Sequence, residues 1–225
     1  MVELYHVLNR GVDGRNIFLD RNDYVRFVHD LYEFNDTAPA QEYSRRDDTF
    51  LDVGNAVSHI QERIVDIHAW CLMKNHYHLL LSERVTGGIA LFTRKLNGGY
   101  ARGFNSTHKR IGVLFQGVSK KVRIERHAHF LYILHYIHLN PLDYLRDAKQ
   151  WRERDKGGIH NVREVLRYLD DYRWSSFLDY CGKKNFPSIL ETRLFGAALG
   201  EYRETIGDYL SEFEGPLPDD KLLLE

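Results

Sequence analysis

The sequence predicts an α+β fold in which helices pack on an antiparallel sheet, with a small helical C-terminal extension. Apolar residues alternate between short strand-like runs and longer segments with helical spacing, in the order β-α-ββ-α-ββ-α. The paired runs are joined by connections too short for a crossover, so neighbouring strands should be antiparallel. With 225 residues, 43% of them hydrophobic, the chain can bury a substantial core.

The N-terminal part begins with a strand at residues 5–9, closed by a turn-rich stretch. A helix capped by Asn22 or Asp23 should run to about residue 35, because its apolar residues recur at helical spacing. Residues 37–49 are polar and contain a proline and a charge run, which favours a loop or insertion. Residues 50–62 are expected to add a short helix.

The central part contains two pairs of strand-like runs. Residues 64–72 and 76–81 are apolar and separated by three residues, which predicts a hairpin. Two glycines then open a helix at 89–104. A second hairpin is predicted from 113–115 and 121–124, turning around a Gln-Gly pair.

A third helix is predicted at residues 128–140. It should stop there because Pro141 disfavours helix at the residue before it. Beyond Trp151 the pattern is again helical, and the glycine pair at 157–158 is the expected break before that C-terminal piece.

Composition excludes several classes of protein. No run of about 18 apolar residues occurs, so no membrane span is expected. The first residues lack the basic and apolar pattern of a signal peptide. Cys71 and Cys181 are the only cysteines, too few for a disulfide framework or a four-cysteine zinc site. These observations predict a protein of a reducing cytoplasm.

The net charge of −1 conceals an uneven distribution. Residues 91–126 hold nine basic side chains against the single acid Glu125, whereas residues 201–225 hold eight acids and two bases. A basic centre with an acidic end predicts a polyanion-binding surface, although a solvated helix face with a solubilising tail gives the same pattern. The basic residues are Arg94, Lys95, Arg102, Lys109, Arg110, Lys120, Lys121, Arg123 and Arg126.

His76 and His78 flank a tyrosine within a strand-like run. Because side chains alternate along a strand, both imidazoles should project from one face. Two imidazoles on one face make half a metal site. The pattern alone is weak, since His127 and His129 repeat the spacing, and a structural role is the alternative.

The helix at 128–140 carries a second candidate set. Phe130, Leu131, Leu134 and Ile137 fall on one side, which predicts the buried face. The opposite side carries His129, Tyr132, Tyr136 and Asn140. Tyr136 and Asn140 are four residues apart and therefore adjacent, so the Asn140 amide oxygen is suited to complete a metal site beside the Tyr136 phenol. A polar face that meets water is the alternative.

Six segments, in order along residues 5–180, resemble the single-tyrosine transposases of the HUH class, which include the insertion-sequence 200-like and REP-associated tyrosine transposases. The one that names the class is a His-hydrophobic-His motif on a strand, here His76, Tyr77 and His78. The segments are YHVLNRG (5–11), CLMKNHYHLLL (71–81), KLNGGY (95–100), GVLFQG (112–117), YIHLNP (136–141) and DYRWSS (171–176). The resemblance implies a ferredoxin/RRM-like sheet, with residues 1–145 as catalytic domain and 146–225 as helical extension.

The resemblance also implies site residues. Tyr136 corresponds to the nucleophile, and His76, His78 and Asn140 correspond to the ligands of a divalent metal, Mg²⁺ or Mn²⁺. Tyr132 lies one turn earlier and lacks an amide four residues on. Two positions depart from the family pattern: Lys74 replaces a usual proline, and Val118 replaces a usual basic residue, which puts one DNA contact in doubt.

The implied activity is metal-dependent cleavage and rejoining of single-stranded DNA at hairpin-associated sites through a covalent 5′-phosphotyrosine. The covalent phosphotyrosine link conserves the energy of the broken phosphodiester bond, so rejoining needs no nucleotide cofactor. The implied partner is hairpin-forming single-stranded DNA in a bacterial-type cytoplasm, at the nucleoid, with a homodimer as an open alternative and no membrane. The predicted DNA-binding residues are Asn9, Arg10, Arg94, Lys95, Arg102, Gln116, Lys120, Lys121 and Arg123.

Two other functions fit parts of the pattern. A domesticated, non-catalytic protein that binds single-stranded or hairpin DNA would keep a sheet face with Tyr and His for stacking. A zinc hydrolase using His76 and His78 needs another strong ligand and gives the basic segment no role. Metal-dependent formation of a covalent protein–DNA adduct separates all three.

Overall fold

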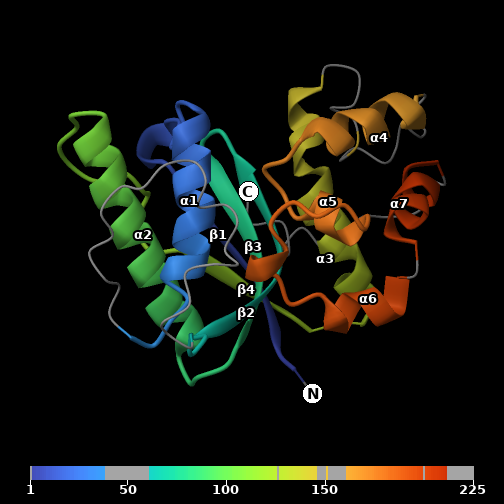
Figure 1. Cartoon of the computed structure of the whole chain (residues 1–225), viewed down its shortest axis with the longest axis horizontal. Helices are drawn as coiled ribbons and strands as arrows, with labels where there is room; N and C mark the ends of the chain where they lie inside the picture. The colour runs from blue at the N-terminus through green and yellow to red at the C-terminus, as the bar shows by residue number, and fades with distance from the viewer. Residues whose placement is uncertain are drawn as a thin grey trace.

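The computed structural model describes residues 2–38, 61–125, 127–145, 151, 161–199 and 201–211 (Figure 1). Most of the predicted loop at 37–49 and of the short helix at 50–62 lies outside these ranges. So do Arg126, the glycine pair at 157–158 and much of the acidic C-terminal stretch. No helix within the described ranges is long and apolar enough to cross a membrane.

The centre of the fold is a four-stranded sheet. Its order is β2-β3-β1-β4, and every neighbouring pair is antiparallel. With α1 between β1 and β2 and α2 between β3 and β4 in the described residues, the connections are those of a ferredoxin-like sheet. The predicted α+β class is confirmed. The strands are β1 (Leu4–Arg10), β2 (Val65–Met73), β3 (His76–Glu83) and β4 (Lys120–Ile124).

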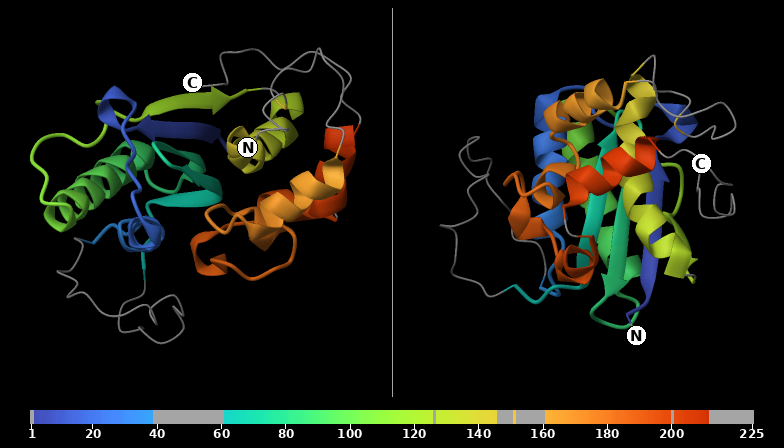
Figure 2. Two further views of the ribbon diagram at one scale, coloured as in Figure 1. Left: turned by 90° about the horizontal axis from the view of Figure 1, so that it is seen from above. Right: turned by 90° about the vertical axis from the view of Figure 1, so that its right-hand side faces the viewer.

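Helices cover both faces of the sheet (Figures 1 and 2). Helices α1 (Arg21–Glu33) and α2 (Gly88–Thr107) lie on one face, and α3 (His127–Leu139) lies on the other. The predicted C-terminal helices pack on the outer side of α3. They are α4 (Val162–Asp171), α5 (Phe177–Tyr180), α6 (Arg193–Leu199) and α7 (Tyr202–Ser211), with single 3₁₀ turns at η1 (Val12–Gly14), η3 (Asn140–Tyr144) and η6 (Pro187–Ile189).

The second hairpin was wrongly predicted. Residues 113–115 form no strand with β4; instead β4 pairs with the outer edge of β1. The segment before β4 bonds to the end of β1, with Val12 N–H donating to Leu114 O at 2.9 Å and Gln116 N–H donating to Arg10 O at 2.8 Å. Five residues of β4 pair with the outer edge of β1. A tight hairpin between residues 113–115 and β4 would leave that edge of β1 unpaired.

The predicted cap of α1 was also misplaced. The capping side chain is Asp20, whose carboxylate accepts from the backbone N–H groups of Asn22 and Asp23. Asp23 instead accepts from Leu19 N–H at 2.8 Å. The helix therefore begins at Arg21, two or three residues earlier than a cap at Asn22 or Asp23 implies.

Alternation along the strands divides the core into two clusters. Val7, Tyr77 and Leu79 point toward α1 and α2. Leu4 and Leu80 point toward α3 and belong to a cluster that continues into the C-terminal helices. The extension thus shares its core with α3 and the sheet, and the division at residue 145 stays a prediction.

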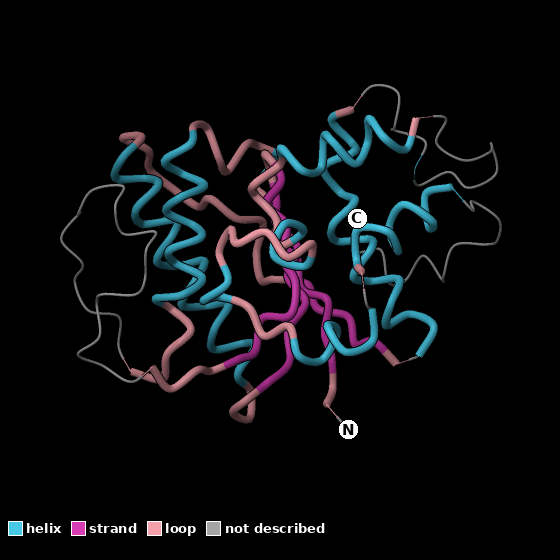
Figure 3. The backbone as a smooth tube through the Cα atoms, turned by 45° about the vertical axis from the view of Figure 1, so that its right-hand side comes forward, coloured by secondary structure: helices cyan, strands magenta, loops and turns pink. Residues whose placement is uncertain are grey.

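Figure 3 shows the strands lying between helices on both sides. Residues 172–176 cover the edge of β2 that no other strand of the sheet occupies. Leu72 N–H donates to Trp174 O at 2.9 Å, and the Tyr172 hydroxyl donates to Leu72 O at 2.6 Å. Ser176 N–H donates to Trp70 O at 3.0 Å. This coverage satisfies backbone groups that an edge strand otherwise leaves open.

Candidate functional site

The ladder between β1 and β3 gathers polar side chains on the face toward α3. Arg10 pairs with His76 and Leu8 pairs with His78, and paired residues share a face. His6, Arg10, His76 and His78 therefore lie on the α3 side of the sheet. His76 is the first residue of β3, directly after the turn that joins it to β2.

His76 is held by the residue before it. Its Nδ1 lies 2.7 Å from Oδ1 of Asn75, and Nδ2 of Asn75 donates to Gly14 O at 3.3 Å. Because the amide nitrogen faces a carbonyl, the amide oxygen faces the imidazole, and Nδ1 of His76 must be the protonated nitrogen. The lone pair then resides on Nε2, which is the arrangement of metal-ligating histidines.

His78 is buried and meets a third histidine. Its Nδ1 lies 3.0 Å from Nε2 of His6, and the two rings stack with centroids 5.2 Å apart. The rings of His76 and His78 lie edge to face with centroids 4.8 Å apart. The predicted pair of imidazoles is therefore adjacent on one face.

Tyr136 lies against these rings in the same chain. Its ring meets His78 edge to face, with centroids 5.7 Å apart, and meets His6 similarly at 5.8 Å. The ring of Tyr132 has its centroid 6.1 Å from that of Tyr136. The predicted nucleophile and a predicted metal ligand thus meet without a second subunit.

Asn140 begins η3, at the end of α3. Its Nδ2 donates to Tyr136 O at 2.8 Å, and Oδ1 is the atom of this side chain that is chemically able to bind a metal. The donor set offered by His76, His78 and Asn140 is two imidazole nitrogens and one amide oxygen. These donors suit Mn²⁺ or Mg²⁺, with the nitrogens favouring Mn²⁺.

The polar face predicted for the third helix is not a solvent-facing one. Tyr136 is 1% exposed, and His138 and Asn140 are fully buried. Helix α3 lies between the sheet and the C-terminal helices, so both of its sides are covered (Figure 2). His78 is fully buried as well, so replacing His78 or Asn140 should affect the stability of the fold in addition to any metal site.

Asn140→Ala is therefore expected to destabilise the protein, by about 1–3 kcal/mol, because it leaves the buried Tyr136 carbonyl without its donor. Asn140→Asp keeps the shape but exchanges the donating nitrogen for an oxygen, so it should also destabilise. Urea unfolding followed by circular dichroism measures both. An Asn140→Ala variant as stable as the parent would contradict this assignment of the amide.

The basic residues of α2 lie on the other side of the sheet from the histidines (Figure 1). Arg94 and Arg102 are exposed there. Lys95 donates to the carbonyl oxygens of Asp36 and Ala38, and partial burial lowers its pKa. The structure does not bring these three predicted DNA-binding residues to the site, and Lys95 instead holds the chain after α1.

Three other predicted DNA-binding residues lie on the site face or at its end. Arg10 is half-buried opposite His76. Lys120 pairs with Leu8, which pairs with His78, so Lys120 shares their face at the exposed edge. Gln116 is exposed, and its backbone is bonded to that of Arg10.

The remaining predicted contacts have structural partners. Lys121 lies over the Tyr5 ring, and Arg123 pairs with Glu3 at 2.6 Å, both on the α2 side of β4. Asn9 is 4% exposed, and its Nδ2 donates to Gly117 O at 3.2 Å. Asn9 thereby holds the loop that carries Gln116.

Three residues near the site were missed by sequence reasoning. His6 could have been found, since it occupies an inward position of the first strand's alternation. Asn75 was quoted only as part of a motif. Trp151, whose ring centroid is 5.8 Å from that of Tyr136, gives no local signal.

A separate group of possible ligands joins α1 and α2. Asp20, Asp23 and His108 place ligand atoms within 4.8 Å of one another, and no other such group of His, Cys, Asp or Glu occurs in the described ranges. Asp20 caps α1, and Asp23 bonds to Leu19 N–H and to His108 at 2.9 Å. Helix capping and an interhelix pair account for these groups.

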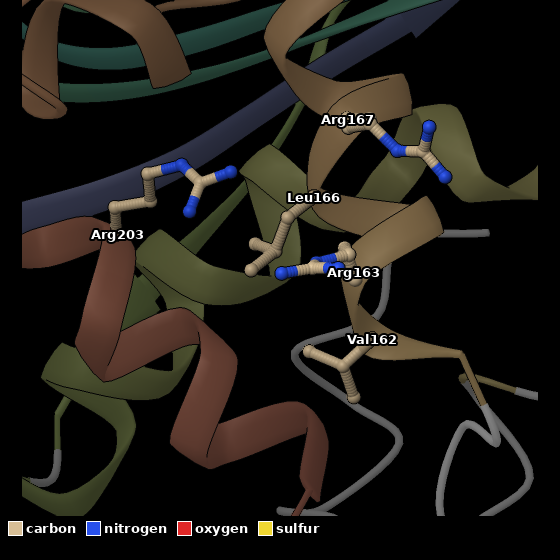
Figure 4. Close-up of a pocket in the computed structure, with 5 residues that line it drawn as sticks. All are labelled: Val162, Arg163, Leu166, Arg167 and Arg203. Carbon is tan, nitrogen blue, oxygen red and sulfur yellow. The ribbon is translucent and has the colours of Figure 1, made fainter.

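A hollow of 630 Å³ lies between α4 and α7 (Figure 4). Arg203, which pairs with Asp170 at 3.0 Å, contributes from α7, and the other lining residues belong to α4. None of the predicted site residues lines it, so the candidate site is the histidine face of the sheet. The lining residues are Val162, Arg163, Leu166, Arg167 and Arg203.

No protein-family model matches the chain, and no curated protein matches it. Among solved structures, it is similar to a REP-associated tyrosine transposase bound to a REP hairpin, at 12% sequence identity and a TM-score of 0.44. The match covers 84% of this chain and 85% of the other. A likeness of this size assigns neither a residue role nor an activity.

Proposed function

We propose that the protein is a metal-dependent transposase that cleaves and rejoins single-stranded DNA at hairpin-associated sites, with Tyr136 as nucleophile. The observation that carries this proposal is the packing of the Tyr136 ring against His78, the inner histidine of the pair on β3. A phenol beside imidazoles on one sheet face supplies a nucleophile and metal ligands together. The six motif segments, in the order of the transposase family, support the same function.

In cleavage, the Tyr136 oxygen attacks the phosphorus of a phosphodiester. The bond from phosphorus to the 3′-oxygen breaks, that oxygen leaves as a hydroxyl after taking up a proton, and the phenol proton is lost. The phosphate stays joined to the 5′ side and to Tyr136. Attack by a 3′-hydroxyl of another strand end reverses these changes and frees the phenol.

His76 and His78 would hold the metal through Nε2, and Asn140 through Oδ1. When bound, the ion neutralises charge on the scissile phosphate and helps to orient it. The chain's own contribution is to fix the two imidazoles beside Tyr136. Asn75 holds the first of them in the tautomer that suits this role.

Burial of Tyr136 adds a requirement to the mechanism. With 1% of the residue exposed, a phosphate reaches it only if part of the cover moves. Trp151 packs on Tyr136 and is anchored by its indole N–H to Asp143 at 2.8 Å. We infer that DNA binding displaces the Trp151 ring from Tyr136.

Arg10 and Lys120 are proposed as phosphate contacts because they share the site face. Arg10→Ala combined with Lys120→Ala should weaken hairpin binding and flatten its salt dependence by about 1.4–1.8 in log–log slope, for two contacts. Fluorescence anisotropy with a labelled hairpin oligonucleotide between low and moderate salt measures the slope.

The matched control is Arg94→Ala combined with Arg102→Ala, which removes the same charge from the opposite side of the sheet. It should change the slope by less than the first pair. The reverse order of effects would place the DNA on α2 and withdraw Arg10 and Lys120 from the proposal.

A non-catalytic hairpin-binding protein is the second candidate, favoured by the burial of Tyr136. Incubation with hairpin oligonucleotides carrying a single-stranded flank, followed by a denaturing gel, distinguishes the two. A covalent protein–DNA adduct that needs Mn²⁺ or Mg²⁺ supports the transposase. Binding without an adduct, over a range of flanking sequences, favours the binding protein.

A further inference from the structure

His6 has no part in the chemistry described above, yet it lies fully buried between the site's two central rings. It contacts His78 through a 3.0 Å hydrogen bond and near-parallel stacking, with 14° between the ring planes. It also meets the Tyr136 ring edge to face, with 76° between the planes. The buried His6 thus contacts both His78 and Tyr136, the two side chains whose orientation the proposed cleavage requires.

We propose that His6 is a positioning residue that fixes the tautomer and orientation of His78. This inference rests on the proposed function, because it concerns how His78 is prepared to bind a metal. In it, Nδ1 of His78 carries the proton and donates it to Nε2 of His6, and the proton of His6 is on its own Nδ1. His78 then directs the lone pair of Nε2 into the site.

The geometry favours positioning over a third metal ligand. His6, His76 and His78 do not place their ligand atoms within 4.8 Å of one another, as the Asp20 group does. The Nε2 atom of His6 faces His78 Nδ1 instead. His76 and His78 are alike in this respect, since the Nδ1 atom of each bonds to a neighbouring side chain, which makes Nε2 the nitrogen suited to hold an ion.

The strand register explains why this contact is rigid. His6 pairs with Leu80, and His78 is two residues away on the same face of β3, so the two rings are diagonal neighbours across a ladder. Both backbones are fixed by pairing, which leaves the rings little freedom. A histidine on a loop could not impose the same constraint.

The test compares two substitutions at His6. His6→Gln keeps an oxygen that accepts from His78, whereas His6→Leu removes the acceptor and keeps the bulk. Mn²⁺ affinity, measured by calorimetry or by electron paramagnetic resonance of the free ion, should fall about 10–100-fold in His6→Leu. It should stay within about 3-fold of the parent in His6→Gln, since the acceptor remains.

The matched control is His68→Leu. His68 is a buried histidine of β2 that bonds to Ser82 at 2.8 Å and to Glu191 O at 3.0 Å. Its replacement should lower the thermal midpoint, as His6→Leu does, but leave Mn²⁺ affinity unchanged. The comparison separates loss of positioning from loss of stability.

A second measurement needs no metal and no activity. Long-range ¹H–¹⁵N spectra of the metal-free protein report which nitrogen of His78 is protonated, and we expect Nδ1. The proposal is overturned if His78 carries its proton on Nε2, or if His6→Leu binds Mn²⁺ as the parent does. If the parent binds no Mn²⁺ but shows the Nδ1 tautomer and loses it in His6→Leu, the positioning role stands and the metal-dependent function fails.

Discussion

Tyr136→Phe is expected to abolish the covalent protein–DNA adduct while leaving hairpin binding within about 2-fold of the parent. Only the attacking oxygen is removed, and the ring that packs on His78 and His6 stays in place. The loss should exceed roughly 1,000-fold, because an enzyme that lacks its nucleophile keeps only the contributions of binding and electrostatics. Denaturing gels with labelled oligonucleotide measure the adduct, and anisotropy measures binding.

Tyr132→Phe is the matched control for that variant. It removes the same atom one turn earlier on α3, where the ring is also buried. Adduct formation should persist in it. Normal cleavage by Tyr136→Phe would remove Tyr136 from the mechanism, and a dead Tyr132→Phe variant beside an active Tyr136→Phe variant would transfer the nucleophile to Tyr132.

His76→Ala and His78→Ala should each reduce cleavage more than about 100-fold, because loss even of a residue behind a metal ligand costs 10–100-fold. The two differ in their structural cost. His76 is only partly buried, whereas His78 is fully buried beneath Tyr136. We therefore expect His78→Ala to lower stability by about 1–3 kcal/mol as well, and His76→Ala to lower it less.

Chelation of the parent should reproduce the loss of cleavage without the loss of stability that His78→Ala shows. Mn²⁺ or Mg²⁺ should restore the chelated parent but not His76→Ala. His68→Ala, which removes a buried imidazole elsewhere on the sheet, should remain active at temperatures below its midpoint. Full cleavage by the chelated parent would show that these imidazoles serve structure alone.

Local periodicity was enough to predict much of the site. Alternation along a strand placed His76 and His78 on one face, and the four-residue spacing in a helix placed Tyr136 beside Asn140. Both relations are fixed by backbone geometry within one element. The structure adds the contact between the two elements, which no single element encodes.

The sequence did not reveal which elements pack on each face of the sheet and of helix α3. The stripe on α3 that contains Tyr136 was predicted to lie opposite the buried face of its helix. It is buried too, because Tyr136 packs against the histidine face of the sheet and against Trp151. Arg94 and Arg102 were predicted to bind DNA together with the residues of the site, yet periodicity does not say on which face of the sheet their helix packs. His6 was overlooked because the pairing of β1 with β3 is a long-range event.

The covering of the β2 edge by residues 172–176 has a consequence for how the chain reaches this fold. The bond from Tyr172 to Leu72 joins residues 100 positions apart, so β2 is synthesised well before the segment that covers its edge. During synthesis from the N-terminus, the sheet can assemble while this strand still offers its open backbone to any neighbouring chain. Chains that lack residues 172–176 would leave the backbone groups of Trp70 and Leu72 open to a neighbouring chain, so such shortened chains should aggregate.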